Sequence, residues 1–369
     1  MESMSPLVPF PQIKVWAAYK YRPCTIPYRF PSDPPQATPT ELLWIQLFRK
    51  SIPSFRKRAE ADDSVSNAAA KASKFAERYA EILDDLQANP LSHGGPPDAI
   101  LLCKLRELCL REVGFTDIYR KVKDEENAKS LALLEGVVAT ADKIQDQGQR
   151  IEHLIKGVFA GNIFDLGSNE LAERYETSGC SFQGSVDQLL PRPWIIDDLD
   201  KFKDKWLRKP WKKAVIFVDN AGADIILGIL PFARELLRRG TKVILAANDV
   251  PSINDITFEE VTQIVSKVKK VENSRETFLG VDAQNLLVIN SGSDLPVIDL
   301  SAISQELAYA TEDVDLIVIE GMGRGIETNL YAQFKCDSVK IGMVKHPEVA
   351  EFLGARLYDC VIKYTEVIP

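Results

Sequence analysis

Short apolar runs that alternate with helical segments in the C-terminal half constrain the fold of this chain most strongly. The runs are rich in Val, Ile and Leu, and each is about as long as a buried strand. They are AVIFVD (214–219), KVILAAN (242–248), NLLVIN (285–290) and DLIVIEG (315–321), separated by helical segments at 224–239, 257–270 and 302–310. Apolar strands that alternate with helices indicate a parallel sheet with both faces covered. SVKIGMV (338–344) and CVIKYT (360–365) are candidates for further strands.

The N-terminal half has a different pattern. Eight prolines in residues 1–38 exclude a helix there and predict an extended arm. Apolar positions then recur three and four residues apart, as in DAILLCKLRELCLREVG (98–114), which predicts helices. We therefore expect the arm, a mainly helical domain (39–207) and an α/β domain (208–369). The expected fold class is α/β plus all-α: a helical domain packed on a parallel, Rossmann-like three-layer α/β/α domain.

Charge and composition exclude several classes of partner and site. The net charge of −8 and the pI near 5.2 argue against nucleic acid, because a phosphate backbone needs clustered cations. The three histidines, His93, His153 and His346, are too few for a His-rich zinc site. A metal would therefore need oxygen ligands, which suits magnesium or manganese.

Nothing in the chain predicts a membrane partner or an oxidising compartment. The six cysteines show no CxxC spacing, which is typical of free thiols in a reducing compartment. Prolines interrupt the N-terminus before any apolar signal region forms, and the longest apolar run, IILGILPFA, is too short to span a bilayer. We expect a cytoplasmic protein.

Polar residues follow each of the four clear strands, at the edge where ligands bind in an open parallel sheet. They are Asp219 and Asn220 after the first strand, Asn248 and Asp249 with Asn254 and Asp255 after the second, Asn290 to Asp294 after the third, and Glu320 to Arg324 after the fourth. One such residue is typical of a turn or a helix N-cap, which is also the plain interpretation of Asp224 and Asp255. Four polar ends at one edge favour a site. Two carboxylates and an amide could converge there on a hard cation.

The glycine-rich segment EGMGRGIETN (320–329) allows a close approach of the backbone to a bound group, and its N–H groups can bind an anion. A tight strand-to-helix turn is the alternative. The segment is neither a dinucleotide fingerprint nor a Walker loop, and Arg324 beside the glycines favours an anionic ligand. A lysine at a strand end, Lys340 or Lys345, would pair with a phosphate oxygen, although either one alone is more typical of a surface charge.

Four segments together resemble a known family: VDNAGADI, NDVPSINDIT, EGMGRGIETN and VKHPEVAEFLG. They are similar to the metal-dependent damage-control phosphatases, formerly a domain family of unknown function. The match is to the plant stand-alone subfamily, which is related to the C-terminal phosphatase domain of a pantothenate-kinase-like protein. The resemblance runs from about residue 40 to the end of the chain.

The resemblance implies roles for particular residues. Asp219, Asn220 and Asp255 would hold a divalent metal ion (Mn, Ni, Co or Mg) in a cleft between the two domains. The implied catalytic residues are Asp219, Asp255, Lys345, Glu320 and Arg324, and the implied phosphate- or substrate-binding residues are Asn162, Asp165, Gly321, Gly323 and Lys345. The attacking group would be a water activated by the metal, positioned by Asp255 or Asp165, or else the Asp219 carboxylate itself.

The implied substrate is a small phosphate ester, 4′-phosphopantetheine and its oxidised forms, with broad sugar-phosphate hydrolysis as an alternative.

Three other classes of protein are alternatives to a damage-control phosphatase. A nucleotide- or S-adenosylmethionine-binding transferase needs more glycine after the first strand than Gly222 alone. A phosphatase of the haloacid dehalogenase type needs an Asp where Ala221 stands. The third is a non-catalytic interaction protein that retains the fold. The oligomeric state is left open.

Overall fold

The computed structural model describes residues 6–15, 20–163, 182–272 and 275–367. Its helices are α1 (Pro39–Glu60), α2 (Ala68–Ala88), η1 (Ser92–Gly94), α3 (Ala99–Glu112), α4 (Arg120–Lys143), α5 (Gln147–Ile163), α7 (Phe182–Asp187), α8 (Leu199–Arg208), η2 (Asp224–Ile229), α9 (Leu230–Arg238), α10 (Phe258–Val268), α11 (Gln305–Ala310), η3 (Met322–Thr328) and α12 (Pro347–Leu353). Its strands are β1 (Ile196–Asp197), β2 (Lys213–Phe217), β3 (Lys242–Ala247), β4 (Lys269–Glu272), β5 (Arg275–Phe278), β6 (Val281–Asp282), β7 (Leu286–Asn290), β8 (Leu316–Glu320), β9 (Asp337–Met343) and β10 (Cys360–Thr365).

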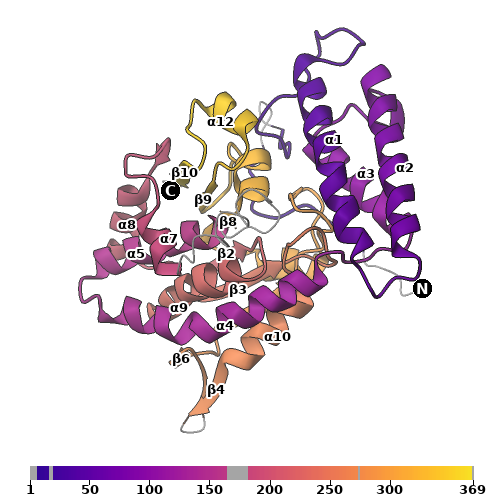
Figure 1. Ribbon diagram of the computed structural model, residues 1–369. Helices are drawn as coiled ribbons and strands as arrows, with labels where there is room; N and C mark the ends of the chain where they lie inside the picture. Colours follow the sequence, from indigo (N-terminus) through magenta and orange to yellow (C-terminus); the bar gives the residue numbers. More distant parts are fainter. Residues whose placement is uncertain (1–5, 16–19, 164–181, 273–274, 368–369) are drawn as a thin grey trace.

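The expected fold class is confirmed: helices cover a sheet that is mostly parallel, and α1 to α3 stand to one side of it (Figure 1). All six expected strands are present, as β2, β3, β7, β8, β9 and β10. Among the described residues the large sheet has seven strands in the order β1-β10-β9-β8-β2-β3-β7. The neighbours β8, β2 and β3 are parallel, so their carboxyl ends meet at one edge.

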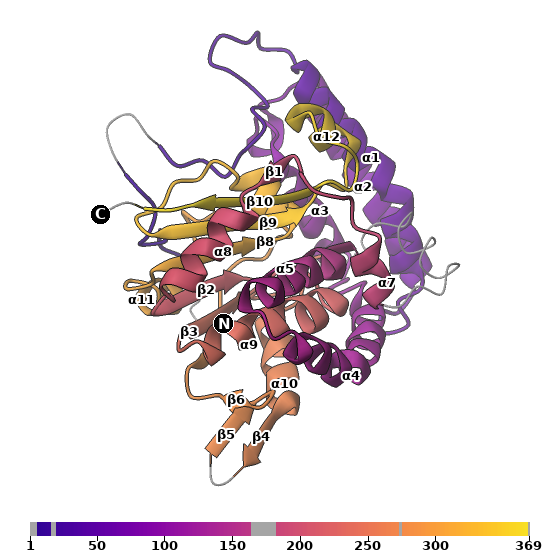
Figure 2. The same ribbon diagram turned by 90° about the vertical axis from the view of Figure 1, so that its left-hand side faces the viewer.

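Two features of the structure differ from a parallel sheet. Strand β10 runs antiparallel to β9, because Val344 is hydrogen-bonded to Tyr358 and Asp359 and the chain returns along β9 without crossing the sheet. A second, antiparallel sheet of β4, β5 and β6, three strands in the part of the chain that the structure describes, projects from the body (Figure 2). Its strands are short and partly polar, so they lack the apolar runs that marked the other strands.

The helix expected at 224–239 is present in two parts. Residues Asp224–Ile229 form a wider π-helical turn, η2, and α9 continues from Leu230. Pro231, in the first turn of α9, has no N–H to donate to the preceding turn, which accounts for the change of hydrogen-bond pattern there. The π-helical turn is fully buried and carries Asp224 into the interior.

Capping residues set where two of the helices begin, and one of these caps positions a polar strand end. At α1, Thr38 accepts a hydrogen bond from the Glu41 N–H at 3.1 Å. At α10, Thr257 accepts from the Glu260 N–H at 3.3 Å, and the Glu260 carboxylate accepts from the Thr257 N–H at 2.9 Å. The second cap makes α10 begin directly after Thr257, two residues after Asp255, so Asp255 stays at the edge of the sheet.

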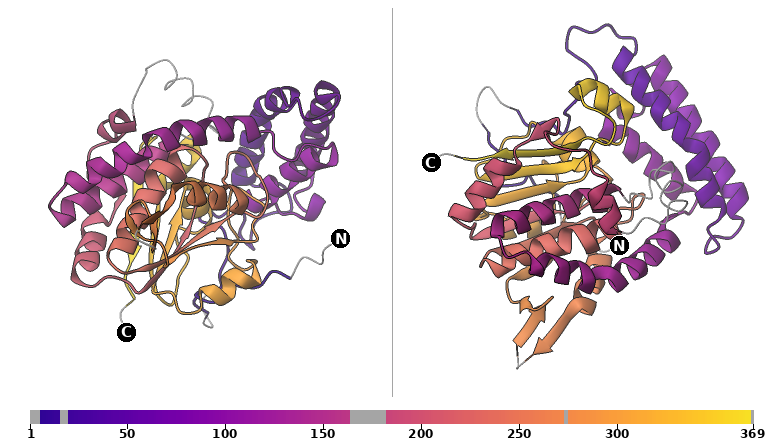
Figure 3. Two further views of the ribbon diagram at one scale, coloured as in Figure 1. Left: turned by 90° about the horizontal axis from the view of Figure 1, so that it is seen from below. Right: turned by 60° about the vertical axis from the view of Figure 1, so that its left-hand side comes forward.

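In the part of the chain that the structure describes, three apolar cores hold the elements together. On one face of the sheet, α4, α5, α8, α9 and α10 share a core with β2, β3 and β9. On the other face, the arm residues Phe10 and Ile13 pack with α11, and the Phe10 ring meets the Phe217 ring edge-to-face at 5.6 Å. The third core lies within α1 to α3 and continues onto Met322 and Val344 beyond the strand ends. Figure 3 shows these layers from two further directions.

Helices α4, α5 and α8 thus pack with the sheet, and α1 to α3 form the part that stands apart, which we call the helical unit. The predicted boundary between the two domains, at residues 207/208, remains a prediction.

Five cysteines among the described residues are free thiols: Cys24, Cys103, Cys109, Cys336 and Cys360. None of the helices that can be described has the length and apolar character needed to cross a membrane.

Candidate active site

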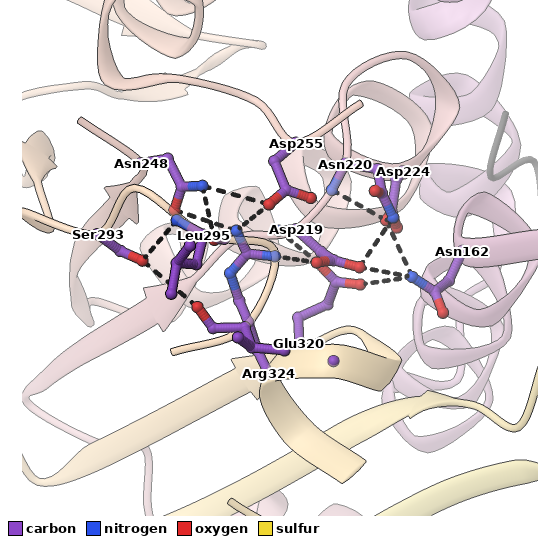
Figure 4. Close-up of polar contacts among 12 residues, drawn as sticks. Asn162, Asp219, Asn220, Asp224, Asn248, Asp255, Ser293, Leu295, Glu320 and Arg324 are labelled. Carbon is purple, nitrogen blue, oxygen red and sulfur yellow. Dashed lines mark hydrogen bonds and ion pairs between the residues drawn. The ribbon is translucent and has the colours of Figure 1, made fainter. Parts of the chain in front are cut away.

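The predicted metal ligands meet where β2 and β3 end (Figure 4). Asp219 and Asn220 follow β2, and Asp255 lies in the segment after β3. Asn220 and Asp255 form an isolated antiparallel bridge, and the Ile256 N–H donates to the Asp219 carbonyl oxygen at 3.0 Å. All three predicted ligands are buried. The structure therefore brings the trio together, and their role as ligands stays a prediction.

Arg324, from η3, joins the carboxylates of the trio. Its guanidinium pairs with Asp219, and its Nη2 donates to Asp255 Oδ2 at 3.0 Å and to Asn248 Oδ1 at 3.1 Å. The Arg324 side chain is only 1% exposed. Burial opposes its charge, but Asp255 and Asp219 outweigh burial and raise the pKa of the guanidinium above its ordinary value. Arg324 is thus a fixed cation between the two carboxylates.

A second acidic group lies behind Asp219. Carboxylate oxygens of Asp219, Asp224 and Glu320 lie within 4.8 Å of one another, and all three residues are buried. Asn162 of α5 holds the group together: its Nδ2 donates to Asp224 Oδ2 and to Glu320 Oε1, each at 3.0 Å. Asn220 Nδ2 donates to Asp219 Oδ2 at 2.8 Å and to Asp224 Oδ2 at 2.9 Å. We call Asp219, Asp224 and Glu320 the inner carboxylate cluster.

The inner carboxylate cluster concentrates negative charge in a place shielded from water. Burial, followed by the charge of Asp219, raises the pKa of Asp224 to about 7. Burial, then Asp224 and Asp219, raises the pKa of Glu320 well above its ordinary value. Asp224 Oδ1 is buried and has no hydrogen-bond partner among the described residues. Clustered carboxylates with an unsatisfied oxygen suit a hard cation, so the residues present fit a divalent metal ion.

Gly321 makes room for the Asp219 carboxylate. Its φ is +97°, and a Cβ built on it would lie 2.3 Å from Asp219 Cγ and Oδ2. The resemblance implied substrate binding for Gly321. The structure shows it packed against Asp219, a role that the glycine pattern alone did not reveal.

A cavity of about 240 Å³ opens between the strand ends and the helical unit. Asp219, Asn220, Asp255 and Lys345 line its polar end. The helical unit and the residues next to it supply a wall that includes Trp44, Leu47, Phe48, Phe55, Ala99, Cys103 and Tyr119. The cleft expected between the helical part and the α/β part is thus present in the structure.

The other predicted site residues take different places around this cavity. Lys345 is 8% exposed, and its N–H donates to Met322 Sδ at 3.1 Å. Gly323 also lines the cavity. Asn162, Glu320 and Arg324 contact Asp219 from behind or beside it. Asp165 lies outside the described residues.

Two expectations about neighbouring polar residues are wrong. The polar residues Asn290 to Asp294 do not line the cavity, because β7 is at the sheet edge and β3 separates it from β2. There Asn290 donates to Asp249, and Asp294 pairs with Arg111 of α3 at 3.3 Å. Only the segment after them reaches the site, where the Leu295 carbonyl oxygen accepts from Asn248 Nδ2 at 2.9 Å. Lys340 is not a surface charge either: it is 1% exposed, and its Nζ donates to Ser338 Oγ at 2.9 Å.

The position of Asp224 before an apolar run predicts a helix cap, and the structure places it in the site instead. Its side chain instead accepts from the backbone and side chain of Asn220 at 3.3 and 2.9 Å. The signal available in the sequence was the third polar residue of VDNAGAD, five positions after Asp219.

The fold and the site define an α/β protein with buried acidic groups and a lysine around a cleft at the strand ends. Residues 47–361 match the model of the damage-control phosphatase ARMT1-like domain. The chain belongs to this family.

Two relatives and one solved structure are similar to the chain. It is 66% identical over 368 residues to the damage-control phosphatase At2g17340 of Arabidopsis thaliana, and the match covers 100% of both chains. It is 32% identical over 372 residues to the 4′-phosphopantetheine phosphatase of Mus musculus, a match that covers 87% of this chain and 45% of that protein. A DUF89 family protein from Pyrococcus horikoshii shares the fold with a TM-score of 0.60 at 16% identity, over 86% of this chain and 95% of that one.

Proposed function

We propose that the chain is a metal-dependent phosphomonoesterase that hydrolyses small phosphorylated metabolites. The observation that carries this proposal is the polar end of the cavity, where a buried lysine, Lys345, shares the lining with Asp219, Asn220 and Asp255. A lysine next to oxygen ligands for a cation places two sources of positive charge around one phosphate group. Family membership and the names of the relatives agree with this chemistry.

Asp219, Asn220 and Asp255 would hold the divalent ion on the cavity side, with Asp224 and Glu320 behind Asp219. When bound, the ion supplies positive charge to the phosphate oxygens and makes nearby water more acidic. The metal could be Mn, Ni, Co or Mg, since all accept oxygen ligands.

The chain's own residues orient the reaction. Lys345 binds phosphate oxygens, and Arg324 holds the carboxylates of Asp219 and Asp255 in fixed positions. Asp219 Oδ1 pairs with Arg324 and Asp219 Oδ2 accepts from Asn220, and the remaining lone pairs of that carboxylate would be needed for the ion. We therefore favour water as the attacking group over the Asp219 carboxylate. Asp255 lines the cavity and is placed to orient that water.

The proposed substrate is 4′-phosphopantetheine, with its oxidised forms. The mouse relative carries that substrate in its name. The cavity wall opposite the acidic end is largely apolar, with Trp44, Phe48 and Phe55 among its residues. Such a wall suits a long acyl-amide chain better than a sugar, whose hydroxyls would lose hydrogen bonds to water there. Broad sugar-phosphate hydrolysis is the weaker alternative.

Phosphate release tests the proposal. The purified chain is treated with a chelator and assayed with 4′-phosphopantetheine and with fructose 6-phosphate, before and after addition of each divalent ion. We expect turnover only with a metal, a preference for the pantetheine ester, and loss of turnover in Asp219→Ala. Glu77→Ala, an exposed carboxylate on α2, serves as the matched control. Metal-independent turnover, or full activity in Asp219→Ala, would contradict the proposal.

A further inference from the structure

An alkyl phosphate needs a proton source for its leaving oxygen, because an alkoxide is a poor leaving group. The position two residues after Asp219, where phosphatases of the haloacid dehalogenase type carry an acid, holds Ala221. We infer that His346 is the general acid of this site and that Glu327 positions it. The inference rests on the proposed phosphatase function.

His346 lies where the polar end of the cavity meets the apolar wall. It follows Lys345 directly, at the N-cap of α12, and both residues line the cavity. Its ring meets the Trp44 ring of α1 edge-to-face at 6.5 Å. A phosphate held by Lys345, with its organic group along the wall, has its ester oxygen at this same junction. His346 is therefore placed to reach the leaving oxygen.

The partner of His346 favours its protonated form. Nδ1 lies 3.2 Å from Glu327 Oε1, and the Glu327 side chain is 9% exposed. Among the described residues, Nε2 has no hydrogen-bond partner that would compete with a substrate. A carboxylate on Nδ1 fixes the ring and leaves Nε2–H as the donor. Glu327 also lines the cavity, which keeps the pair together at the site.

The charges that face His346 come from η3, from α12 and from the segment between β9 and α12. Burial disfavours the charged ring, although the side chain retains 41% of its exposure. The hydrogen bond and charge of Glu327, with Glu348, outweigh burial and the repulsion of Lys345, so the pKa of His346 is raised above its ordinary value. A raised pKa keeps the imidazole charged at neutral pH, as a general acid requires.

In the proposed step, His346 gives one proton to the leaving oxygen. Water attacks phosphorus and a new P–O bond forms, while the ester P–O bond breaks and its electron pair goes to the ester oxygen. That oxygen takes the proton from His346 Nε2 and leaves as the alcohol. The attacking water loses a proton to solvent, and the partly exposed imidazole regains one from solvent. The net reaction is a phosphate monoester plus water giving an alcohol plus inorganic phosphate.

Cys103, Lys345 and the two carboxylates Asp219 and Asp255 also line the cavity and fit this role less well. Burial raises the pKa of the Cys103 thiol to about 12, so it is a weak acid at neutral pH. Lys345 is needed on the phosphate oxygens. Asp219 and Asp255 both pair with Arg324, which holds them at the polar end of the cavity.

Leaving-group dependence tests the inference. His346→Gln, Glu327→Gln and the surface control Glu77→Gln are compared with the unmodified metal-loaded chain. The substrates are 4′-phosphopantetheine and p-nitrophenyl phosphate, whose leaving group needs no proton. We expect His346→Gln to lower kcat about 100-fold on the alkyl ester and less than about threefold on the aryl ester.

The pH profile gives a second readout that a merely structural role would not change. With the alkyl ester, kcat of the unmodified chain falls as pH rises through the raised pKa of His346. Glu327→Gln moves that fall to lower pH, and His346→Gln removes it. If His346→Gln lowers kcat equally on both esters, or if the pH profile of Glu327→Gln is unshifted, the assignment of His346 as general acid is overturned, while the proposed phosphatase function stands. If the unmodified chain hydrolyses neither ester, the proposed function falls and the assignment falls with it.

Discussion

Substitution of Gly321 by alanine is the most direct perturbation of the site's geometry. The new Cβ would lie 2.3 Å from Asp219 Cγ, whereas ordinary van der Waals contacts begin at 3.4 Å, so the two groups must separate by 3.4 − 2.3 = 1.1 Å. A displacement of about 1 Å in a catalytic group lowers the rate roughly 100-fold. The backbone, at φ +97° and ψ 157°, adds strain of about 1–3 kcal/mol for any residue with a Cβ.

Gly240→Ala separates strain from displacement. Gly240 has φ +86°, but nothing lies within 4 Å of its Cβ position, and it follows α9 at the far end from the site. We expect both variants to lose about 1–3 kcal/mol of unfolding free energy in urea titrations. Only Gly321→Ala should lose about 100-fold in kcat/KM for 4′-phosphopantetheine. If Gly321→Ala retains activity within threefold of Gly240→Ala, the close packing of Gly321 on Asp219 does not control catalysis.

Three further predictions concern stability, substrate choice and the carboxylate donors. Burial, and then Lys363, lowers the pKa of Lys340 to about 7. Above pH 7 the unfolded chain therefore binds more protons at this side chain than the folded chain does, and the free energy of unfolding rises with pH. Urea unfolding curves should show that Lys340→Met removes about 1–2 kcal/mol of this rise between pH 7 and 9, and identical pH slopes in the two proteins would contradict the prediction. Ser51→Phe fills part of the cavity. It should raise the KM for 4′-phosphopantetheine about tenfold and the KM for p-nitrophenyl phosphate less than threefold. Equal changes in the two KM values would count against the apolar wall as the substrate site. Asn162→Leu removes the donor shared by Asp224 and Glu320 and should lower the unfolding free energy of the chelated protein by about 1–3 kcal/mol, whereas an unchanged midpoint would show that those carboxylates find other partners.

The fold could be predicted largely because its strands are buried on both faces. Strands β2, β3 and β8 are continuous apolar runs, and such runs are readable from a single sequence. The antiparallel β10 is just as apolar as a parallel strand, so its direction was not encoded in that pattern. Direction depends instead on long-range hydrogen bonds, such as those of Val344, that sequence patterns do not display.

The site was predictable in outline because parallel strand ends meet at one edge. Asp219, Asn220 and Asp255 were identified in this way, together with the resemblance, and the structure places them side by side. The burial of Asp224 was not predictable, since it depends on the π-helical turn that carries it inward. His346 lies in the segment VKHPEVAEFLG but was not singled out, because its partner Glu327 is 19 residues away and meets it only in the folded chain.

The central claim is that Asp219, Asn220 and Asp255 hold one divalent ion. Titration of Mn²⁺ into the chelated chain, followed by electron paramagnetic resonance, tests it without any turnover. We expect one ion per chain, and affinity weakened by about 100-fold or more in both Asp219→Asn and Asp255→Asn, with Glu77→Gln unchanged. Unaltered binding in Asp255→Asn, with loss in Asp224→Asn, would contradict the claim and assign the ion to the inner carboxylate cluster.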